Sequence, residues 1–139
     1  MKRCLVTGAT GALGPVVVQA FRDAGYEVRA FVRRAGAAES LGGVEVFEGD
    51  IADHAAIAAA MQNVDVVVHL AAVLHVVNPR PDLEAECDRV NVDGTRVVTE
   101  AAANNPARAD RNAGKSVKRS ERKQNRLRVI PNQINQGAE

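Results

Sequence analysis

Aromatic residues are scarce in this 139-residue sequence, which has one tyrosine, three phenylalanines and no tryptophan. Acid–base chemistry that needs a phenol would therefore depend on Tyr26 alone. Cysteine is equally rare, because Cys4 and Cys87 are far apart and neither belongs to a Cys-x-x-Cys or Cys/His cluster. This spacing argues against a disulfide framework and the common zinc clusters, and it favours free thiols in a reducing cytoplasm.

Long apolar runs are missing as well. No stretch of 18 apolar residues occurs, so we expect no transmembrane helix and no membrane partner. Residues 1–3 lead straight into a short apolar run, without the apolar core and cleavage site of a signal peptide. We therefore expect a cytoplasmic protein.

Net charge is small, but its distribution divides the chain. The formal charge is +1 overall. Residues 1–104 hold 9 Lys and Arg against 14 Asp and Glu, a charge of −5, whereas residues 105–139 hold 9 against 3, a charge of +6. We expect an ordered domain over residues 1–104 and a basic polar tail over residues 105–139 that is mostly disordered.

The most informative segment is a glycine-rich turn at residues 7–14, Thr-Gly-Ala-Thr-Gly-Ala-Leu-Gly. It follows a short apolar run and precedes an apolar-periodic segment, which predicts a strand, a turn and a helix. Backbone N–H groups at such a helix N-terminus can face a pyrophosphate. Gly8 permits the turn, Gly11 lets phosphates approach the backbone, and Gly14 lets the helix pack closely.

Strand and helix patterns alternate along the first 104 residues. Apolar runs predict strands over residues 2–6, 27–32, 44–47 and 65–70, and helices over residues 12–24, 54–62 and 83–104, with Asp53 as the N-cap of the second helix. This alternation predicts an α/β fold, a truncated Rossmann-type parallel sheet of about four strands. In the order 3-2-1-4 the fourth strand is a long apolar edge, through which we expect self-association.

Four motifs in this order resemble the N-terminal half of an extended short-chain dehydrogenase/reductase, the NAD-dependent epimerase/dehydratase group. They are the glycine turn, Gly-Asp-Ile at residues 49–51, His-Leu-Ala-Ala at residues 69–72, and Asn-Val-Asp-Gly-Thr at residues 91–95. The resemblance covers residues 1 to about 104. It implies an NAD(P)-binding domain of an oxidoreductase, epimerase or dehydratase.

The resemblance also implies roles for individual residues. The turn would line the pyrophosphate, the Asp50 carboxylate would accept the exocyclic amine of adenine, and Asn91 would keep the active site in order. Alternatives are a turn-forming Asp50 and a helix-surface Asn91. We expect His69 to end its strand beside the cofactor rather than to catalyse, because no Cys, Asp or Ser partner is placed for it. The predicted cofactor-binding residues are Gly8, Thr10, Gly11, Ala12, Leu13, Gly14, Arg33, Arg34, Asp50, Ile51, Ala71 and Ala72.

The end of the second predicted strand bears on the choice of cofactor. A carboxylate there would select NAD by bonding the ribose 2′-hydroxyl. This sequence has Arg33 and Arg34 instead, and two guanidinium groups suit a 2′-phosphate. We expect NADP rather than NAD, the alternative being a solvated basic turn.

The catalytic residues of the resembled family are missing. The family uses a Ser or Thr and a Tyr-x-x-x-Lys pair, but residue 30, four beyond Tyr26, is alanine. We therefore expect no catalytic residue here, and the substrate stays unknown. The chain is then a cofactor-binding fragment without autonomous catalysis, a non-catalytic dinucleotide sensor, or a non-functional truncated product.

The basic tail has a composition foreign to the preceding domain. The abrupt change predicts a reading-frame disruption or a truncated gene, with a genuine tail or a recruited binding arm as alternatives. Nucleic acid is not an expected partner, because residues 105–139 contain no aromatic side chain for base stacking.

Overall fold

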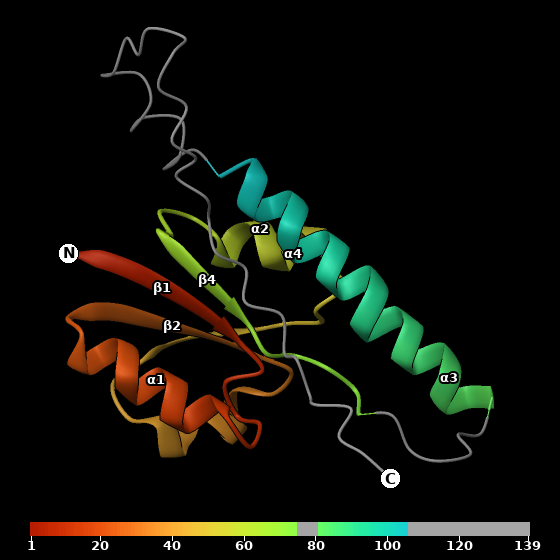
Figure 1. Cartoon of the computed structure of the whole chain (residues 1–139), viewed down its shortest axis with the longest axis horizontal. Coiled ribbons are helices and arrows are strands. Elements are labelled where there is room, and N and C mark those ends of the chain that lie inside the picture. Colours follow the sequence, from red (N-terminus) through yellow and green to blue (C-terminus); the bar gives the residue numbers. More distant parts are fainter. Residues whose placement is uncertain (75–80, 106–139) are drawn as a thin grey trace, which may run out of the picture.

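The structure is a computed structural model that describes residues 1–74 and 81–105. Its centre is a parallel sheet in the order β3-β2-β1-β4 (Figure 1). This confirms the predicted α/β Rossmann-like architecture. The strands are β1 (Lys2–Thr7), β2 (Tyr26–Val32), β3 (Glu45–Glu48) and β4 (Val66–His69).

Helices cover both faces of the sheet. Figure 1 shows α1 (Gly14–Asp23) on one side and α2 (His54–Ala60) and α4 (Gly94–Ala103) on the other. A 3-10 helix, η1 (Ala35–Leu41), follows β2. Asp53 is the N-cap of α2 as predicted, since its carboxylate accepts hydrogen bonds from the backbone N–H groups of Ala55 and Ala56 at 2.8 and 3.2 Å.

The predicted helix over residues 83–104 is not a regular α-helix. It consists of α3 (Pro81–Cys87), a π-helical segment η2 (Asp88–Asp93) and α4, which follow one another without a break. Isolated π-helical turns are rare and occur frequently at functional sites. A 3.6-residue apolar period does not distinguish such a segment from the α-helix around it.

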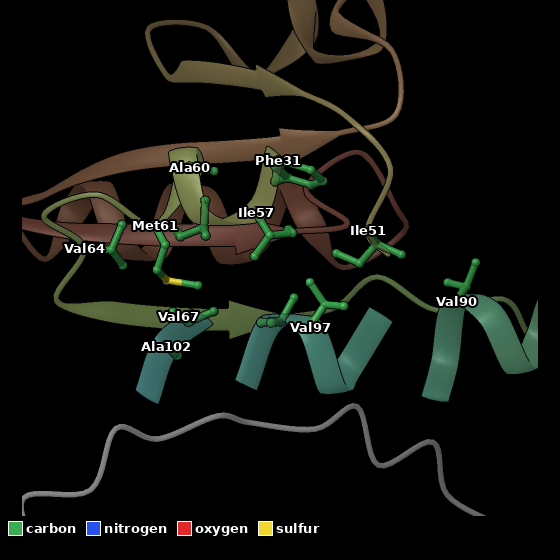
Figure 2. Packing of buried hydrophobic residues seen from close by; sticks show 12 residues of the cluster. Phe31, Ile51, Ile57, Ala60, Met61, Val64, Val67, Val90, Val97 and Ala102 are labelled. Carbon is green, nitrogen blue, oxygen red and sulfur yellow. The ribbon is translucent and has the colours of Figure 1, made fainter. Parts of the chain in front are cut away.

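Alternation along β1 divides the core between the two faces. Leu5 packs with residues of α2 and α4, whereas Cys4 and Val6 pack with residues of α1 and η1. Figure 2 shows the α2–α4 side, with Ile57 and Met61 of the α2 region facing Val97 of α4. Burial raises the pKa of the Cys4 thiol to about 12, so this cysteine is a core residue rather than a nucleophile.

The fourth strand is shorter than predicted. It has four residues, and Val67 and Val68 are buried, with 1% and 3% of their surface exposed. The helices on the two faces cover these side chains, so the prediction of a long apolar edge is wrong. Within the described residues β4 pairs with β1 only, so it is an edge strand of the sheet. Self-association through it stays a prediction.

Several predictions concern residues outside the described ranges. The predictions for the basic tail beyond residue 105 are among them. Within residues 1–74 and 81–105, no helix is both long and apolar enough to cross a membrane. Over the same ranges, no group of three or more His, Cys, Asp or Glu side chains is placed to hold a metal ion.

Candidate functional site

A cavity of about 440 Å³ lies at the carboxyl ends of β1, β2, β3 and β4. Loops after parallel strands meet at this edge of a sheet, where ligands bind in open α/β folds. Nine of the twelve predicted cofactor-binding residues line it: Gly8, Thr10, Gly11, Arg33, Arg34, Asp50, Ile51, Ala71 and Ala72. Eight further residues complete the lining: Phe31, Val32, Ala37, Gly49, Leu70, Val73, Arg89 and Val90.

Gly8 joins two walls of the cavity. Its φ is +68°, a left-handed conformation that favours glycine. A Cβ atom at this position would lie 2.6 Å from the backbone nitrogen of Ala71. Only glycine therefore lets the turn after β1 approach the end of β4 this closely. The prediction that Gly8 serves the turn is in accord with this geometry.

The remaining turn residues divide into two groups. Thr10 and Gly11 line the cavity, and the Gly11 N–H donates to the Gly8 carbonyl at 2.9 Å. Ala12, Leu13 and Gly14 do not line it. Gly14 is instead buried against Ala9, and an added Cβ would lie 2.0 Å from the Ala9 carbonyl oxygen. The absence of a side chain at Gly14 therefore lets the start of α1 pack closely on the turn.

Arg33 and Arg34 follow β2 directly and are exposed at the rim of the cavity. Within residues 1–74 and 81–105, neither guanidinium group makes a hydrogen bond or ion pair. No carboxylate occupies the two positions after β2. The rim thus presents two cationic groups that are free to receive an anion.

The Asp50 carboxylate is already engaged. Both of its oxygens lie 2.6 Å from Nη1 of Arg89, and Oδ1 also accepts the Ala52 N–H at 2.8 Å. The Ala52 N–H first, and Arg89 second, hold the pKa of Asp50 below its ordinary value. Asp50 is therefore an ionised carboxylate at the wall of the cavity, with three of its about four acceptor sites occupied.

Arg89 is the main functional candidate that sequence reasoning missed. It reaches the cavity from η2, and its Nε and Nη2 donate to the two carboxylate oxygens of Glu86 at 2.9 Å each. Its guanidinium group is thus held between the carboxylate of Glu86 in α3 and that of Asp50 in the loop after β3. No sequence signal identified it, because an arginine within a long helical pattern is typical of a solvent-facing position.

His69 links three elements through a chain of hydrogen bonds. Its Nδ1 lies 2.6 Å from Oγ1 of Thr7, and its Nε2 lies 3.0 Å from Oγ1 of Thr95. The Thr95 hydroxyl donates to the Asn91 carbonyl, and the Thr7 hydroxyl accepts the Ala71 N–H at 3.4 Å. These roles fit a neutral ring with its proton on Nε2, and burial lowers the pKa of His69. His69 therefore joins β1 and α4 at the end of β4, the strand-end position expected for it, and the expectation that it does not catalyse stays a prediction.

Asn91 fixes the loop that follows β4. Its side-chain oxygen accepts the Val73 N–H at 2.8 Å, and its side-chain nitrogen donates to the Val73 carbonyl at 2.9 Å. This pair of bonds ties η2 to the wall of the cavity. The arrangement agrees with the ordering role that the resemblance implies for Asn91.

Tyr26 is distant from the cavity along its strand. It begins β2, whereas Phe31 and Val32 at the other end of the strand line the cavity. Its ring packs edge-on against Phe21, with centroids 5.1 Å apart. Tyr26 is therefore a packing residue at the end of β2 away from the cavity, and the absence of a catalytic role stays a prediction.

Two glycines outside the turn also shape the site. A Cβ on Gly49 would lie 2.9 Å from side-chain atoms of Ala56 and Phe31, and one on Gly94 would lie 2.7 Å from a methyl carbon of Ile51. Figure 2 shows Ile51 and Val90 near each other at one end of the cluster. Gly94 thus brings the helix that carries Val90 and Arg89 close to the cavity.

A glycine turn between β1 and α1, at a cavity beside the ends of four parallel strands, defines a dinucleotide-binding domain of the Rossmann type. The chain belongs to the NAD dependent epimerase/dehydratase family, whose profile matches residues 4–115. The match runs past residue 104, and the boundary placed there from composition stays a prediction.

Individual relatives support this assignment. The chain is 40% identical over 100 residues to sterol demethylase protein B of Methylococcus capsulatus, covering 70% of this chain and 30% of that protein. It is 34% identical over 96 residues to a 3 beta-hydroxysteroid dehydrogenase/Delta 5-->4-isomerase of Mycobacterium tuberculosis, covering 67% and 26%. The chain thus spans less than a third of the length of these curated relatives.

Solved structures agree with the fold. A short-chain dehydrogenase/reductase superfamily protein from Agrobacterium tumefaciens, solved with bound NAD, is 35% identical with a TM-score of 0.62, covering 76% of this chain and 29% of that one. Serine dehydrogenase from Escherichia coli is 23% identical with a TM-score of 0.69, covering 79% and 57%. The second likeness concerns the fold alone.

Proposed function

We propose that this chain binds a nicotinamide dinucleotide in the cavity beside the glycine turn, with NADP preferred over NAD. The convergence of nine predicted residues on one cavity carries the proposal. The turn would supply backbone N–H groups for a pyrophosphate. The small side chains of Ala71 and Ala72 line the cavity and would let a ligand lie close to the end of β4. The cofactor would supply hydride transfer, and these residues would bind and orient it.

The preference for NADP rests on the rim of the cavity. Neither guanidinium group of Arg33 and Arg34 makes a hydrogen bond or ion pair within the described residues, although Arg33 is attracted at longer range to the carboxylates of Asp50 and Glu86. A 2′-phosphate would offer both arginines charge-assisted hydrogen bonds. NAD carries no charge at that position. The two cofactors should therefore differ mainly in what they gain from these side chains.

Exchanging Arg33 for aspartate tests this preference. In calorimetric titrations, Arg33→Asp should weaken NADP+ binding by about tenfold or more, since hydrogen bonds to charged groups contribute about 1.5–3 kcal/mol. NAD+ binding should change much less. Arg96→Asp is the matched control, because Arg96 is an exposed residue of α4 outside the cavity lining. An equal loss of affinity for NADP+ and NAD+ would contradict the proposed preference for NADP.

We further propose that the chain holds the cofactor without turning over an alcohol by itself. The 139 residues contain no Tyr-x-x-x-Lys pair, and Tyr26 starts its strand at the end away from the cavity. A turnover assay with NADP+ and a panel of secondary alcohols should give no NADPH above background. Steady NADPH formation, lost in Gly8→Ala, would contradict this. A failure to bind either cofactor would favour a non-functional truncated product.

A further inference from the structure

The guanidinium group of Arg89 is held along its edges. Nη1 faces Asp50, while Nε and Nη2 face Glu86. Two carboxylates in the plane of a guanidinium group fix its orientation and leave its two flat faces free of hydrogen bonds. The side chain is 39% exposed, and Arg89 lines the cavity. A flat cationic surface is therefore available at this wall.

The surroundings of Arg89 suit a planar base. Val90 and Ile51 are buried members of one apolar cluster, and both line the same cavity as Arg89. Apolar side chains beside a guanidinium face form a site for an aromatic ring, which gains both burial and cation–π attraction. Arg33, near enough to lower the pKa of Asp50, places the phosphate-binding rim next to this wall.

The state of Asp50 bears on how a base would be recognised. Both of its oxygens already accept hydrogen bonds from Arg89, and one also accepts the Ala52 N–H. Three of its about four acceptor sites are therefore occupied, two of them by a charged donor at 2.6 Å, and an amine would have about one site left at Oδ2. Charge-assisted bonds are stronger than bonds from a neutral amine, so Arg89 keeps the sites that it holds.

We propose that Arg89 is the residue that contacts the adenine of the dinucleotide, through the face of its guanidinium group, and that Asp50 and Glu86 are positioning residues that hold it flat. This inference rests on the proposed dinucleotide binding. The π-helical segment contributes by presenting Arg89 and Val90 to the cavity while Asn91 is bonded to Val73.

The test compares NADP+ with its deaminated analogue, nicotinamide hypoxanthine dinucleotide phosphate, in calorimetric titrations of the whole chain. Deamination replaces the exocyclic amine with a carbonyl oxygen but keeps the flat ring. If Arg89 contacts the face of the base, the two ligands should bind within about twofold of each other. If Asp50 accepted the amine directly, the carbonyl would face a carboxylate, and binding should weaken by about tenfold or more.

Substitutions of Arg89 and Asp50 provide the second part of the test. Arg89→Met should weaken both ligands by about tenfold, as a cation–π contact in a partly desolvated site predicts. Arg89→Lys should restore only part of the loss, because an ammonium group has no flat face. Asp50→Asn, which keeps an acceptor for the Ala52 N–H, should weaken binding in the wild type but have no added effect in Arg89→Met.

The outcomes separate the inference from the function on which it rests. Arg96→Met is the matched control and should bind like the wild type, and thermal melts should show that each variant is folded. A wild type that binds NADP+ while Arg89→Met binds equally well would overturn the role of Arg89 alone. An Asp50→Asn effect that persists in Arg89→Met would also overturn it. A wild type that binds neither dinucleotide would overturn both proposals.

Discussion

Gly8 is subject to two constraints that can be measured separately. Its φ is positive and an added Cβ would collide with Ala71, whereas Gly25 has a φ of +78° and nothing within 4 Å of an added Cβ. Gly25→Ala should lower the free energy of unfolding by about 1–2 kcal/mol from backbone strain alone. Gly8→Ala should lower it by about 2–5 kcal/mol, because overpacking adds to the strain.

Chemical denaturation of the two variants would check this. A Gly8→Ala variant no less stable than Gly25→Ala would show that the turn can move away from β4. The cofactor cavity would then be more adaptable than the close approach of Gly8 to Ala71 implies.

His69 should make stability depend on pH. Burial sets its folded pKa below the ordinary value of 6.5, so the unfolded chain binds the proton more readily. Its contribution is fully present above about pH 6.5 and is lost as the pH falls toward the folded pKa. The free energy of unfolding should therefore fall on acidification from about pH 7 to about pH 5.

Histidine variants identify which side chain makes the free energy of unfolding depend on pH. His69→Gln should flatten the dependence, even if it lowers stability overall. His54→Gln, at an exposed position in the first turn of α2, should keep the wild-type slope. An unchanged slope in His69→Gln would assign the effect to other groups.

At the scale of single elements, the α2 N-cap offers a direct test. The Asp53 carboxylate satisfies two backbone N–H groups that α2 would otherwise leave without a partner. Asp53→Ala should destabilise the fold by about 1 kcal/mol, and Asp53→Ser should recover most of the loss. Melting curves of the three proteins would decide, and equal stability of the Ala and Ser variants would contradict the capping account.

Sequence reasoning predicted elements whose patterns are local. The strands, the glycine turn and the Asp53 cap follow from short-range periodicity and residue preferences. The strand order follows from the Rossmann-type topology that the alternation of strands and helices indicates. Sequence reasoning missed the π-helical segment, since a local widening of the helix is set by tertiary contacts such as Asn91 with Val73. Arg89 was missed for the same reason, because its partner Asp50 lies 39 residues earlier.

Arg29, within β2, is a second residue whose surroundings could not be predicted from the sequence. Its side chain is buried although it is charged, with a hydrogen bond to Glu45, two to backbone carbonyls at the end of α2, and its guanidinium carbon 4.5 Å from the Phe47 ring centroid. A buried charge is stable only when it is paired and hydrogen-bonded. All of these partners come from segments that are distant from Arg29 in the sequence. A strand pattern alone gives no means of separating it from a surface arginine.

At the scale of the whole molecule, the two edges of the sheet differ in charge. β3 carries Glu45 and Glu48, whereas β4 has no acidic or basic residue besides the buried His69. Charged side chains protect an edge from pairing with another chain. We therefore expect the 139-residue chain to self-associate through β4 rather than β3.

Sedimentation over a range of concentrations would test this difference. Val66→Lys should reduce association, because Val66 is a half-buried residue of the open edge. Val46→Lys on β3 should leave association unchanged. A wild type that stays monomeric and melts in one sharp transition would contradict the prediction.

The most direct test of cofactor binding is a map of backbone amide signals in a nitrogen-15 correlation spectrum during titration with NADP+. The account predicts saturable shifts at one site, concentrated at Gly8, Gly11, Arg33 and Ala71, with the α2–α4 surface around Met61 and Ala101 unaffected. The same shifts with NAD+ should need more ligand. An unchanged spectrum, or shifts confined to the α2–α4 surface, would contradict the claim that this cavity holds a nicotinamide dinucleotide.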